Sequence, residues 1–215
     1  MNIETVVIPF GRDRKHQNLV HGYYMLRHRV FAQGLGWDLI TIKDVELDEY
    51  DREGAEYVIA VDGDTGEVVG GARLFPTDHE FYSSQLSLDP NTYMIADAAA
   101  GLLEGLPEEI CTFELPRQAD VWELTRVAAV NPGVAAPMLE AANNHLALKG
   151  VCKCLAMGSP AIMRVARKLG YAPSSIGPIV RNESGNFLAF ECEVVPPKAA
   201  GSSPNNSGLR LQRCI

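Results

Sequence analysis

Charged residues lie close together in short stretches of this 215-residue sequence. Asp48 and Asp51 are three residues apart in the polar stretch VELDEYDREG, and Arg73 ends an otherwise small and apolar run. Glu123 and Arg126 are three residues apart within WELTRVAA. Carboxylate and guanidinium groups in sheltered positions can bind ionic substrates or transfer protons. These residues are therefore the first candidates for a functional site.

Arg27 is a sixth charged candidate because it interrupts an apolar pattern. Apolar residues recur at helical spacing over residues 18–33, and Gly34 and Gly36 end the pattern. The spacing predicts a helix over 18–33 with Arg27 inside its apolar sector. The alternative is that the Arg27 side chain extends past this sector to water.

Each of the other charges also has a structural explanation when taken alone. An aspartate pair before a glycine is typical of turns, and Glu123 and Arg126 could form the solvated face of an edge strand. On a regular strand, residues three apart point to opposite faces. Both can reach one site only if the strand bulges, which we expect near Leu124 or Thr125.

The remaining pattern predicts an α/β (α+β) fold, a mixed central sheet flanked by helices. Strands 56–62 and 65–75 form a hairpin through the turn at residues 63–66. A short helix is expected at 80–86, inside the irregular region 76–116. Further elements follow: strand 120–130, helix 132–150 opened by Pro132, strand 151–158, helix 159–171 capped by Ser159, and strands 178–182 and 187–195.

Length and composition favour one domain, residues 1–195, followed by a loosely ordered tail, 196–215, rich in Pro, Ser, Asn and Gly. The formal net charge of −8 argues against nucleic acid or an anionic membrane as partner. Early charges and the lack of a long apolar run predict a cytoplasmic protein. Cys152 and Cys154 fit one face of a strand better than a metal site, so no metal is expected.

Several motifs together resemble the N-acyl-homoserine lactone synthases, the autoinducer synthases of bacterial quorum sensing. LRHRVFAQGLGW matches the family's Arg, the Phe four residues on and the Trp after the helix. DEYD matches its Asp-x-x-Asp, GGARL its strand arginine and ELTR its Glu-x-x-Arg. The similarity runs from about residue 24 to residue 178, and the stretch 76–120 is long for this family.

The resemblance implies a fold like that of the acetyl-coenzyme A-dependent N-acetyltransferases, and a condensation of S-adenosylmethionine with an acyl thioester. The acyl donor is acyl carrier protein or coenzyme A, methylthioadenosine is released, and no cofactor is needed. The first bond requires a neutral amine, so Glu123 is the candidate base, with Arg126 beside it as a catalytic residue. Backbone N–H groups at the splayed strand would stabilise the oxyanion.

The resemblance also implies binding residues. Arg27, Phe31 and Trp37 would form one wall of the adenosylmethionine pocket, and Asp48 and Asp51 would orient the cationic substrate. Arg73 would hold these carboxylates in an ion-pair network of Asp48, Asp51, Arg73, Glu123 and Arg126.

An apolar tunnel for the acyl chain is expected between strand 151–158 and helix 138–150, with Ala156 and Met157 in its wall. Ala156 stands where a Thr in the family is associated with 3-oxo chains, so we expect unsubstituted chains. A basic patch could dock the acidic carrier protein: Lys149, Lys153, Arg164, Arg167 and Lys168. The last three could equally be an ordinary solvated helix face.

Two other functions stay open at this point. An acetyl-coenzyme A-dependent N-acetyltransferase would cradle pyrophosphate at a glycine-rich turn, but NPGVAAPM offers one glycine and a proline that lacks a donor. A non-catalytic protein that binds adenosylmethionine or the carrier would bind without turnover.

Overall fold

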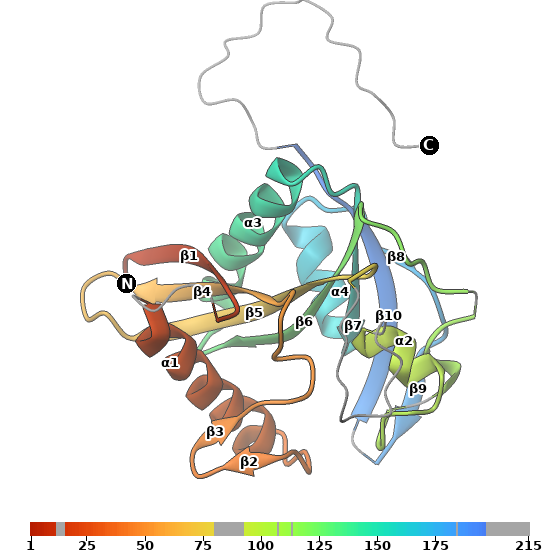
Figure 1. The fold of residues 1–215 in the computed structure, drawn as a ribbon, viewed down its shortest axis with the longest axis horizontal. Helices are drawn as coiled ribbons and strands as arrows, with labels where there is room; N and C mark the ends of the chain where they lie inside the picture. The colour runs from red at the N-terminus through yellow and green to blue at the C-terminus, as the bar shows by residue number, and fades with distance from the viewer. Residues whose placement is uncertain (12–15, 80–92, 107, 113, 184, 197–215) are drawn as a thin grey trace, which may run out of the picture.

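The structure is a computed structural model that describes residues 1–11, 16–79, 93–106, 108–112, 114–183 and 185–196. The described residues form an eight-stranded sheet in the order β1-β4-β5-β6-β7-β10-β8, with β9 pairing with β10 (Figure 1). Only the β6–β7 pair in this sheet is parallel. The strands are β1 Ile3–Pro9, β4 Glu56–Asp62, β5 Val68–Pro76, β6 Val121–Ala129, β7 Lys153–Gly158, β8 Ser174–Ser175, β9 Val180–Asn182 and β10 Gly185–Glu193.

Helices cover both faces of the sheet (Figure 1). Helix α1, Gln17–Arg27, runs directly into the wider π-helix η2, His28–Gly34, and shares a buried core with α2, Met94–Ala99. Helices α3, Pro132–Leu148, and α4, Pro160–Lys168, lie on the other face. Two strands, β2 Thr41–Ile42 and β3 Val45–Glu46, form a separate hairpin, and η3, Glu108–Ile110, is a short 3-10 turn.

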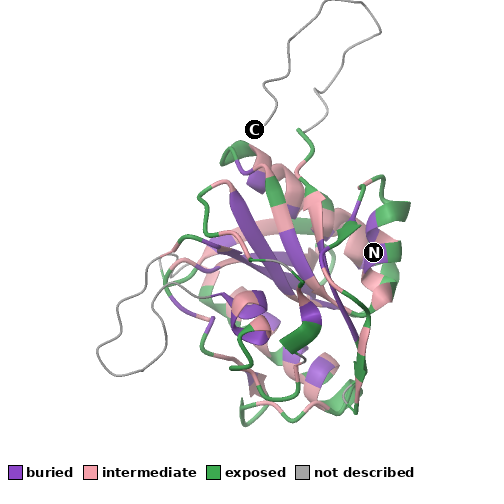
Figure 2. Ribbon diagram, turned by 90° about the vertical axis from the view of Figure 1, so that its right-hand side faces the viewer, coloured by how far each residue is buried: buried purple, intermediate pink, exposed green. Residues whose placement is uncertain are grey.

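The two faces enclose two separate cores because side chains alternate along each strand. In β4, Tyr57 and Ile59 join the core under α1, whereas Val58 and Ala60 join the core under α3. Central strands that are covered on both sides read as nearly continuous apolar runs, as EYVIAVD does. Figure 2 shows long buried stretches along the middle strands and exposed stretches on the helices.

The predicted fold class and most predicted elements are confirmed: the hairpin, the 120–130 strand and the later helices and strands. The predicted 18–33 helix exists, but its second half is the π-helix η2. Strands β1, β8, β2 and β3 were not predicted. Ser159 does occupy the N-cap of α4, but its side chain makes no cap hydrogen bond. At the start of α3, by contrast, the Asn131 side chain does cap the helix, accepting from the Gly133 N–H at 2.9 Å.

Some expectations lie outside the residues that the structure describes: the 80–86 helix, and the tail from residue 197 onward. Among the described helices, none is long and apolar enough to cross a membrane. No group of three or more His, Cys, Asp and Glu side chains in the described part of the chain is placed to hold a metal ion.

Candidate active site

A bulge in β6 brings Glu123 and Arg126 to the same face of the sheet. Arg73 pairs with Thr125 and Gly71 with Ala128, so β6 contains one residue more than β5 over this interval. Arg126 has a φ of 53°, a left-handed conformation that is uncommon for a residue with a side chain. The expected bulge near Thr125 is therefore confirmed, and it lies at Arg126, the next residue.

Six charged side chains, three of them buried and three partly buried, meet on the α1 face, and we call them the six-charge cluster. It combines three guanidinium groups with three carboxylates from α1, β3, the following turn, β5 and β6: Arg27, Arg73, Arg126, Glu46, Asp48 and Asp51. Arg27 has no exposed surface, so the alternative that it extends to water is wrong.

Each guanidinium group in the cluster contacts more than one carboxylate. Arg27 Nη1 lies 2.8 Å from both carboxylate oxygens of Asp51, and Arg27 Nε also pairs with Glu46. Arg73 pairs with Asp48 and lies 3.0 Å from Asp51. Arg126 Nη2 lies 2.8 Å from Asp48, and its Nε lies 3.3 Å from Glu46. The three guanidinium groups and the three carboxylates thus form one connected ion-pair network.

Asp48 and Asp51 also form the turn that the spacing suggested. The Asp51 carboxylate accepts from the Asp48 backbone N–H at 2.9 Å, and the Asp51 N–H donates to the Asp48 carbonyl at 3.0 Å. Tyr57 Oη donates to Asp51 at 3.1 Å. Turn formation and ion pairing are therefore not alternatives here, because the turn holds the carboxylates that the arginines bind.

The cluster is open to solvent only at its Asp48 and Arg126 edge. Their side chains are 10% and 11% exposed, whereas the other four are at most 3% exposed. Burial alone would raise the pKa of Asp48, but the Arg73, Arg126 and Arg27 guanidinium groups outweigh burial and hold this pKa well below its usual range. Asp48 is therefore ionised at neutral pH, at the point where a ligand can reach the cluster.

An aromatic stack borders this open edge. The Phe31 and Trp37 rings are stacked with centroids 5.3 Å apart, and the Arg126 guanidinium carbon lies 5.8 Å from the Phe31 centroid. The backbone N–H of Trp37 donates to the Phe31 carbonyl at 3.1 Å, which fixes the chain after η2. The structure thus brings Phe31 and Trp37 together beside Arg126, with Arg27 deeper in the cluster.

Glu123 does not belong to the ion-pair network, which corrects the sequence-based expectation. Its carboxylate accepts from the backbone N–H groups of Met94 and Ile95, at 3.1 and 2.6 Å, at the start of α2. Burial raises the pKa of Glu123 to about 7, although the Ile95 N–H, Arg73 and the Met94 N–H oppose this rise. Met94 also contacts Arg126 through its sulfur, 4.0 Å from Nη1.

Glu46 takes the place expected for Glu123 in the network and was missed in the sequence. Its side chain is 1% exposed and pairs with both Arg27 and Arg126. The available signal was its position two residues before Asp48, since residues two apart on an extended chain point to the same side.

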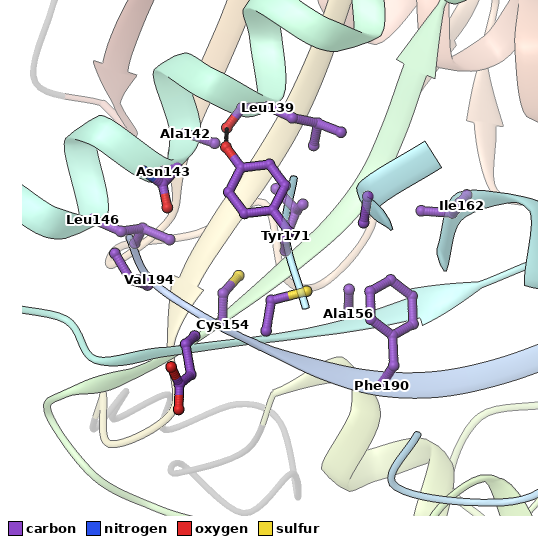
Figure 3. A pocket seen from close by; sticks show the side chains of 14 residues that line it. Leu139, Ala142, Asn143, Leu146, Cys154, Ala156, Ile162, Tyr171, Phe190 and Val194 are labelled. Atoms are coloured by element: carbon purple, nitrogen blue, oxygen red, sulfur yellow. Dashed lines mark hydrogen bonds between the residues drawn. The ribbon is translucent and has the colours of Figure 1, made fainter. Parts of the chain in front are cut away.

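An apolar pocket lies on the opposite face of the sheet, between α3, α4, β7 and β10 (Figure 3). Ala156 lines it, as expected, together with Leu124, Leu139, Cys154, Ile162 and Phe190. Tyr171 points into it, and its hydroxyl donates to the Leu139 carbonyl at 3.4 Å. Met157 does not line this pocket: alternation along β7 directs it to the α1 face, where it packs against the first core.

The predicted basic patch divides into two parts. Lys149 lies 2.8 Å from Glu56 and 4.8 Å from the centroid of the Trp122 ring, and Lys153 pairs with Glu191 at 3.1 Å. Arg164, Arg167 and Lys168 are exposed along α4. Among the described residues, Lys149 and Lys153 are thus paired with glutamates, whereas the three basic residues of α4 have no acidic partner.

The turn before α3 makes a poor pyrophosphate cradle. Pro132 has no N–H, and the Gly133 N–H is already bound by the Asn131 side chain. The geometry therefore disfavours the acetyltransferase alternative.

Comparisons with known proteins point to one family. The sequence profile of the autoinducer synthase family matches residues 12–88. An acyl-homoserine-lactone synthase from Ralstonia nicotianae is 30% identical over 165 residues, covering 71% of this chain and 71% of that protein. The crystal structure of TofI in a ternary complex with an inhibitor and MTA is 30% identical, with a TM-score of 0.70 over 89% of this chain and 91% of that chain.

More distant structures share the fold alone. An acyl-CoA N-acyltransferase from Pseudomonas aeruginosa is 10% identical, with a TM-score of 0.56 over 88% of this chain and 99% of that chain. This likeness confirms the predicted resemblance to the N-acetyltransferase fold. The identity to the curated synthases, by contrast, leads to one assignment: the chain belongs to the acyl-homoserine-lactone synthase family of acyltransferases.

Proposed function

We propose that this enzyme joins the methionine part of S-adenosylmethionine to an acyl group carried as a thioester, and releases an N-acyl-homoserine lactone, methylthioadenosine and the free thiol. The observation that carries this proposal is the six-charge cluster, which is sealed everywhere except at Asp48 and Arg126, beside the Phe31–Trp37 stack. Both substrates are consumed, so the reaction needs no further cofactor.

The open edge of the cluster matches the charges of adenosylmethionine. The substrate carries an ammonium, a carboxylate and a sulfonium group. Asp48 would receive the ammonium group, Arg126 would receive the carboxylate, and the faces of Phe31 and Trp37 would attract the sulfonium. Arg27 and Arg73 would hold Asp48 and Asp51 in place, since both are buried and bound to them.

Glu123 is the proposed base for the first bond. The amine nitrogen must lose a proton to attack the thioester carbonyl, and the proton would pass to Glu123, whose pKa of about 7 suits transfer near neutral pH. Collapse of the tetrahedral intermediate breaks the thioester carbon–sulfur bond and expels the thiolate, which takes the second proton from the nitrogen and leaves as the free thiol. The substrate carboxylate then attacks the methionine-chain carbon bonded to the sulfonium sulfur, and that carbon–sulfur bond breaks, so the lactone closes and methylthioadenosine is released.

The acyl chain would enter the apolar pocket at the point where the parallel strands β6 and β7 separate. Pairing of β6 with β7 ends at Leu124 and Ala156, and both residues line the pocket. Beyond this point the two strands no longer share hydrogen bonds, so free backbone N–H groups there could stabilise the oxyanion. The acyl chain and the charged substrate would thus reach one reaction centre from opposite faces.

Acyl carrier protein is the donor that we favour over coenzyme A. The exposed basic residues of α4, namely Arg164, Arg167 and Lys168, lie next to the pocket, because Ile162 and Ala166 of the same helix line it. An acidic carrier protein would be attracted to this face. The test is a triple charge reversal, Arg164→Glu, Arg167→Glu and Lys168→Glu.

We expect this change to raise KM for acyl carrier protein at least tenfold and to leave KM for an acyl-pantetheine donor unchanged. Lys43→Glu, an exposed charge reversal in the β2–β3 turn, serves as the matched control. Equal effects on both donors would contradict docking at α4.

Mass spectrometry of the products tests the reaction itself. Purified protein is incubated with S-adenosylmethionine labelled in its methionine part and a panel of acyl-carrier-protein and acyl-coenzyme A donors. Labelled acyl-homoserine lactone together with methylthioadenosine supports the proposal. Acylation of another amine with adenosylmethionine untouched would support an N-acetyltransferase, and binding without turnover would support a non-catalytic binding protein.

A further inference from the structure

The hydroxyl group of Tyr23 contacts the backbone of the bulged residue. Tyr23 lies in α1, has no exposed surface, and its Oη donates to the Arg126 carbonyl at 2.7 Å. These two residues are 103 positions apart in the chain. The bond therefore ties α1 to the point at which β6 departs from regular strand geometry.

This carbonyl needs a partner because the bulge takes it out of the sheet ladder. The β5–β6 register passes from Thr125 directly to Ala128, which leaves Arg126 and Val127 without Cα partners on β5. A buried carbonyl without a hydrogen bond is costly. Burial raises the pKa of Tyr23 well above its ordinary value, so its hydroxyl keeps its proton and remains a donor at neutral pH.

The neighbouring strand makes room for the Tyr23 ring at Gly71. A Cβ atom built on Gly71 would lie 2.3 Å from Cδ2 of this ring, which no real contact permits. Gly71 is also the last β5 residue before the register shift. The Tyr23 ring can therefore lie next to the bulge at Arg126 because position 71 has no side chain.

We propose that Tyr23 is a positioning residue for adenosylmethionine: its bond to the Arg126 carbonyl holds the bulge, and the bulge directs the Arg126 guanidinium to the open edge of the cluster. Without this bond, the strand can relax toward regular pairing, and the Arg126 side chain then turns away from Asp48 and Glu46. This inference rests on the proposed function, because Arg126 is taken to bind the substrate carboxylate.

A double-mutant cycle tests whether Tyr23 acts through Arg126. The four proteins are the wild type, Tyr23→Phe, Arg126→Ala and the double variant, and steady-state kinetics are measured for both substrates. Tyr23→Phe should raise KM for adenosylmethionine about tenfold, with little change in kcat or in KM for the acyl donor. In the Arg126→Ala background the same change should have no further effect.

Tyr24→Phe is the matched control. It removes a hydroxyl from the adjacent residue of α1, where Tyr24 Oη contacts Tyr57 Oη at 2.7 Å instead of the bulge. Its effect on KM for adenosylmethionine should stay below threefold. Equal effects of Tyr23→Phe and Tyr24→Phe, or additive effects of Tyr23→Phe and Arg126→Ala, would overturn the positioning role.

Urea unfolding of the same four proteins separates this inference from the proposed function. If the wild type makes no lactone with any donor, the proposed function fails, but the coupling between Tyr23 and Arg126 is still measurable. Tyr23→Phe should then clearly lower the urea midpoint of unfolding in the wild-type background. The same change should lower it much less in the Arg126→Ala background, because β6 there no longer has the Arg126 ion pairs that favour the bulge. Equal shifts in both backgrounds would overturn the inference.

Discussion

The two faces of the sheet carry different kinds of side chain, although the same strands form both. On the α1 face, six charged side chains hold one another at fixed distances, and each one depends on a particular partner. On the α3 face, apolar side chains from two helices and three strands surround a pocket that is lined by few polar atoms. Ion pairs and hydrogen bonds are directional, whereas apolar contacts depend mainly on buried area and shape.

This difference assigns the faces different tasks. The α1 face is suited to hold one charged substrate in one orientation, because removal of any member deprives sheltered opposite charges of one of their partners. The α3 face is suited to a flexible acyl chain, because its wall tolerates changes that preserve volume and polarity. Changes on the α1 face should therefore be costly, and changes on the α3 face should mainly alter preference.

The largest effect is expected for Glu123→Gln, which removes the proposed base from the α1 face. We expect kcat to fall by about 10² to 10⁴, the usual contribution of a positioned base. Stopped assays of lactone formation measure it. Glu191→Gln, which removes a carboxylate from the exposed pair with Lys153, should leave kcat within about twofold. If Glu123→Gln retained kcat within tenfold, another group would have to act as base.

The next effect concerns the six-charge cluster as a structural unit. Arg73→Met leaves Asp48 and Asp51 buried with too little positive charge, and we expect it to lower the free energy of unfolding by about 3–5 kcal/mol. Urea denaturation measures this loss. Lys153→Met breaks an exposed pair and should cost less than about 1 kcal/mol. Similar losses for both variants would mean that burial does not distinguish the cluster from surface pairs.

A pH dependence of opposite sign should separate Glu123 from Asp48. The folded-state pKa of Glu123, about 7, lies above its ordinary value of 4.5, so its contribution to stability is present at low pH and lost as pH rises toward 7. The loss amounts to about 3 kcal/mol. Asp48 has a lowered pKa, so its contribution is present at neutral pH and is lost as pH falls below its ordinary value.

Urea denaturation of the wild type and Glu123→Gln between pH 4.5 and pH 8 measures the Glu123 contribution. The stability of the wild type relative to the variant should fall as pH rises through this range. A difference that stays constant across the range would show that Glu123 titrates normally in the folded protein.

The smallest effect is expected on the α3 face. Ala156→Thr places a hydroxyl in the apolar pocket, and a hydroxyl can donate to a 3-oxo group. We expect the ratio of kcat/KM for 3-oxo over unsubstituted acyl donors to rise by up to about tenfold. Met157→Thr places the same hydroxyl on the other face of β7 and should leave this ratio unchanged. A shift in both variants would argue against an acyl chain lying along Ala156.

Local patterns were sufficient for most of the fold. The β4–β5 hairpin, the helix opened by Pro132 and the apolar strand at 153–158 each carry their signal within a few residues. Strand β1 was missed because its seven residues lie between a short N-terminal end and a charged stretch, and its pairing with β4 gives no local mark. The π-helical form of η2 was missed because a seven-residue i→i+5 segment that continues an α-helix is too short to show a periodicity of its own.

For the site, the sequence by itself determined which residues carry charge in apolar surroundings, and five of the six cluster members follow from motif spacing: Arg27, Asp48, Asp51, Arg73 and Arg126. Only the tertiary structure decided that Glu46 completes the cluster and that Glu123 binds the start of α2 instead. It also decided that Lys149 and Lys153 are already paired. A charged group's partner depends on which segments meet in space, and segments distant in the chain leave no mark of that meeting in their own residues.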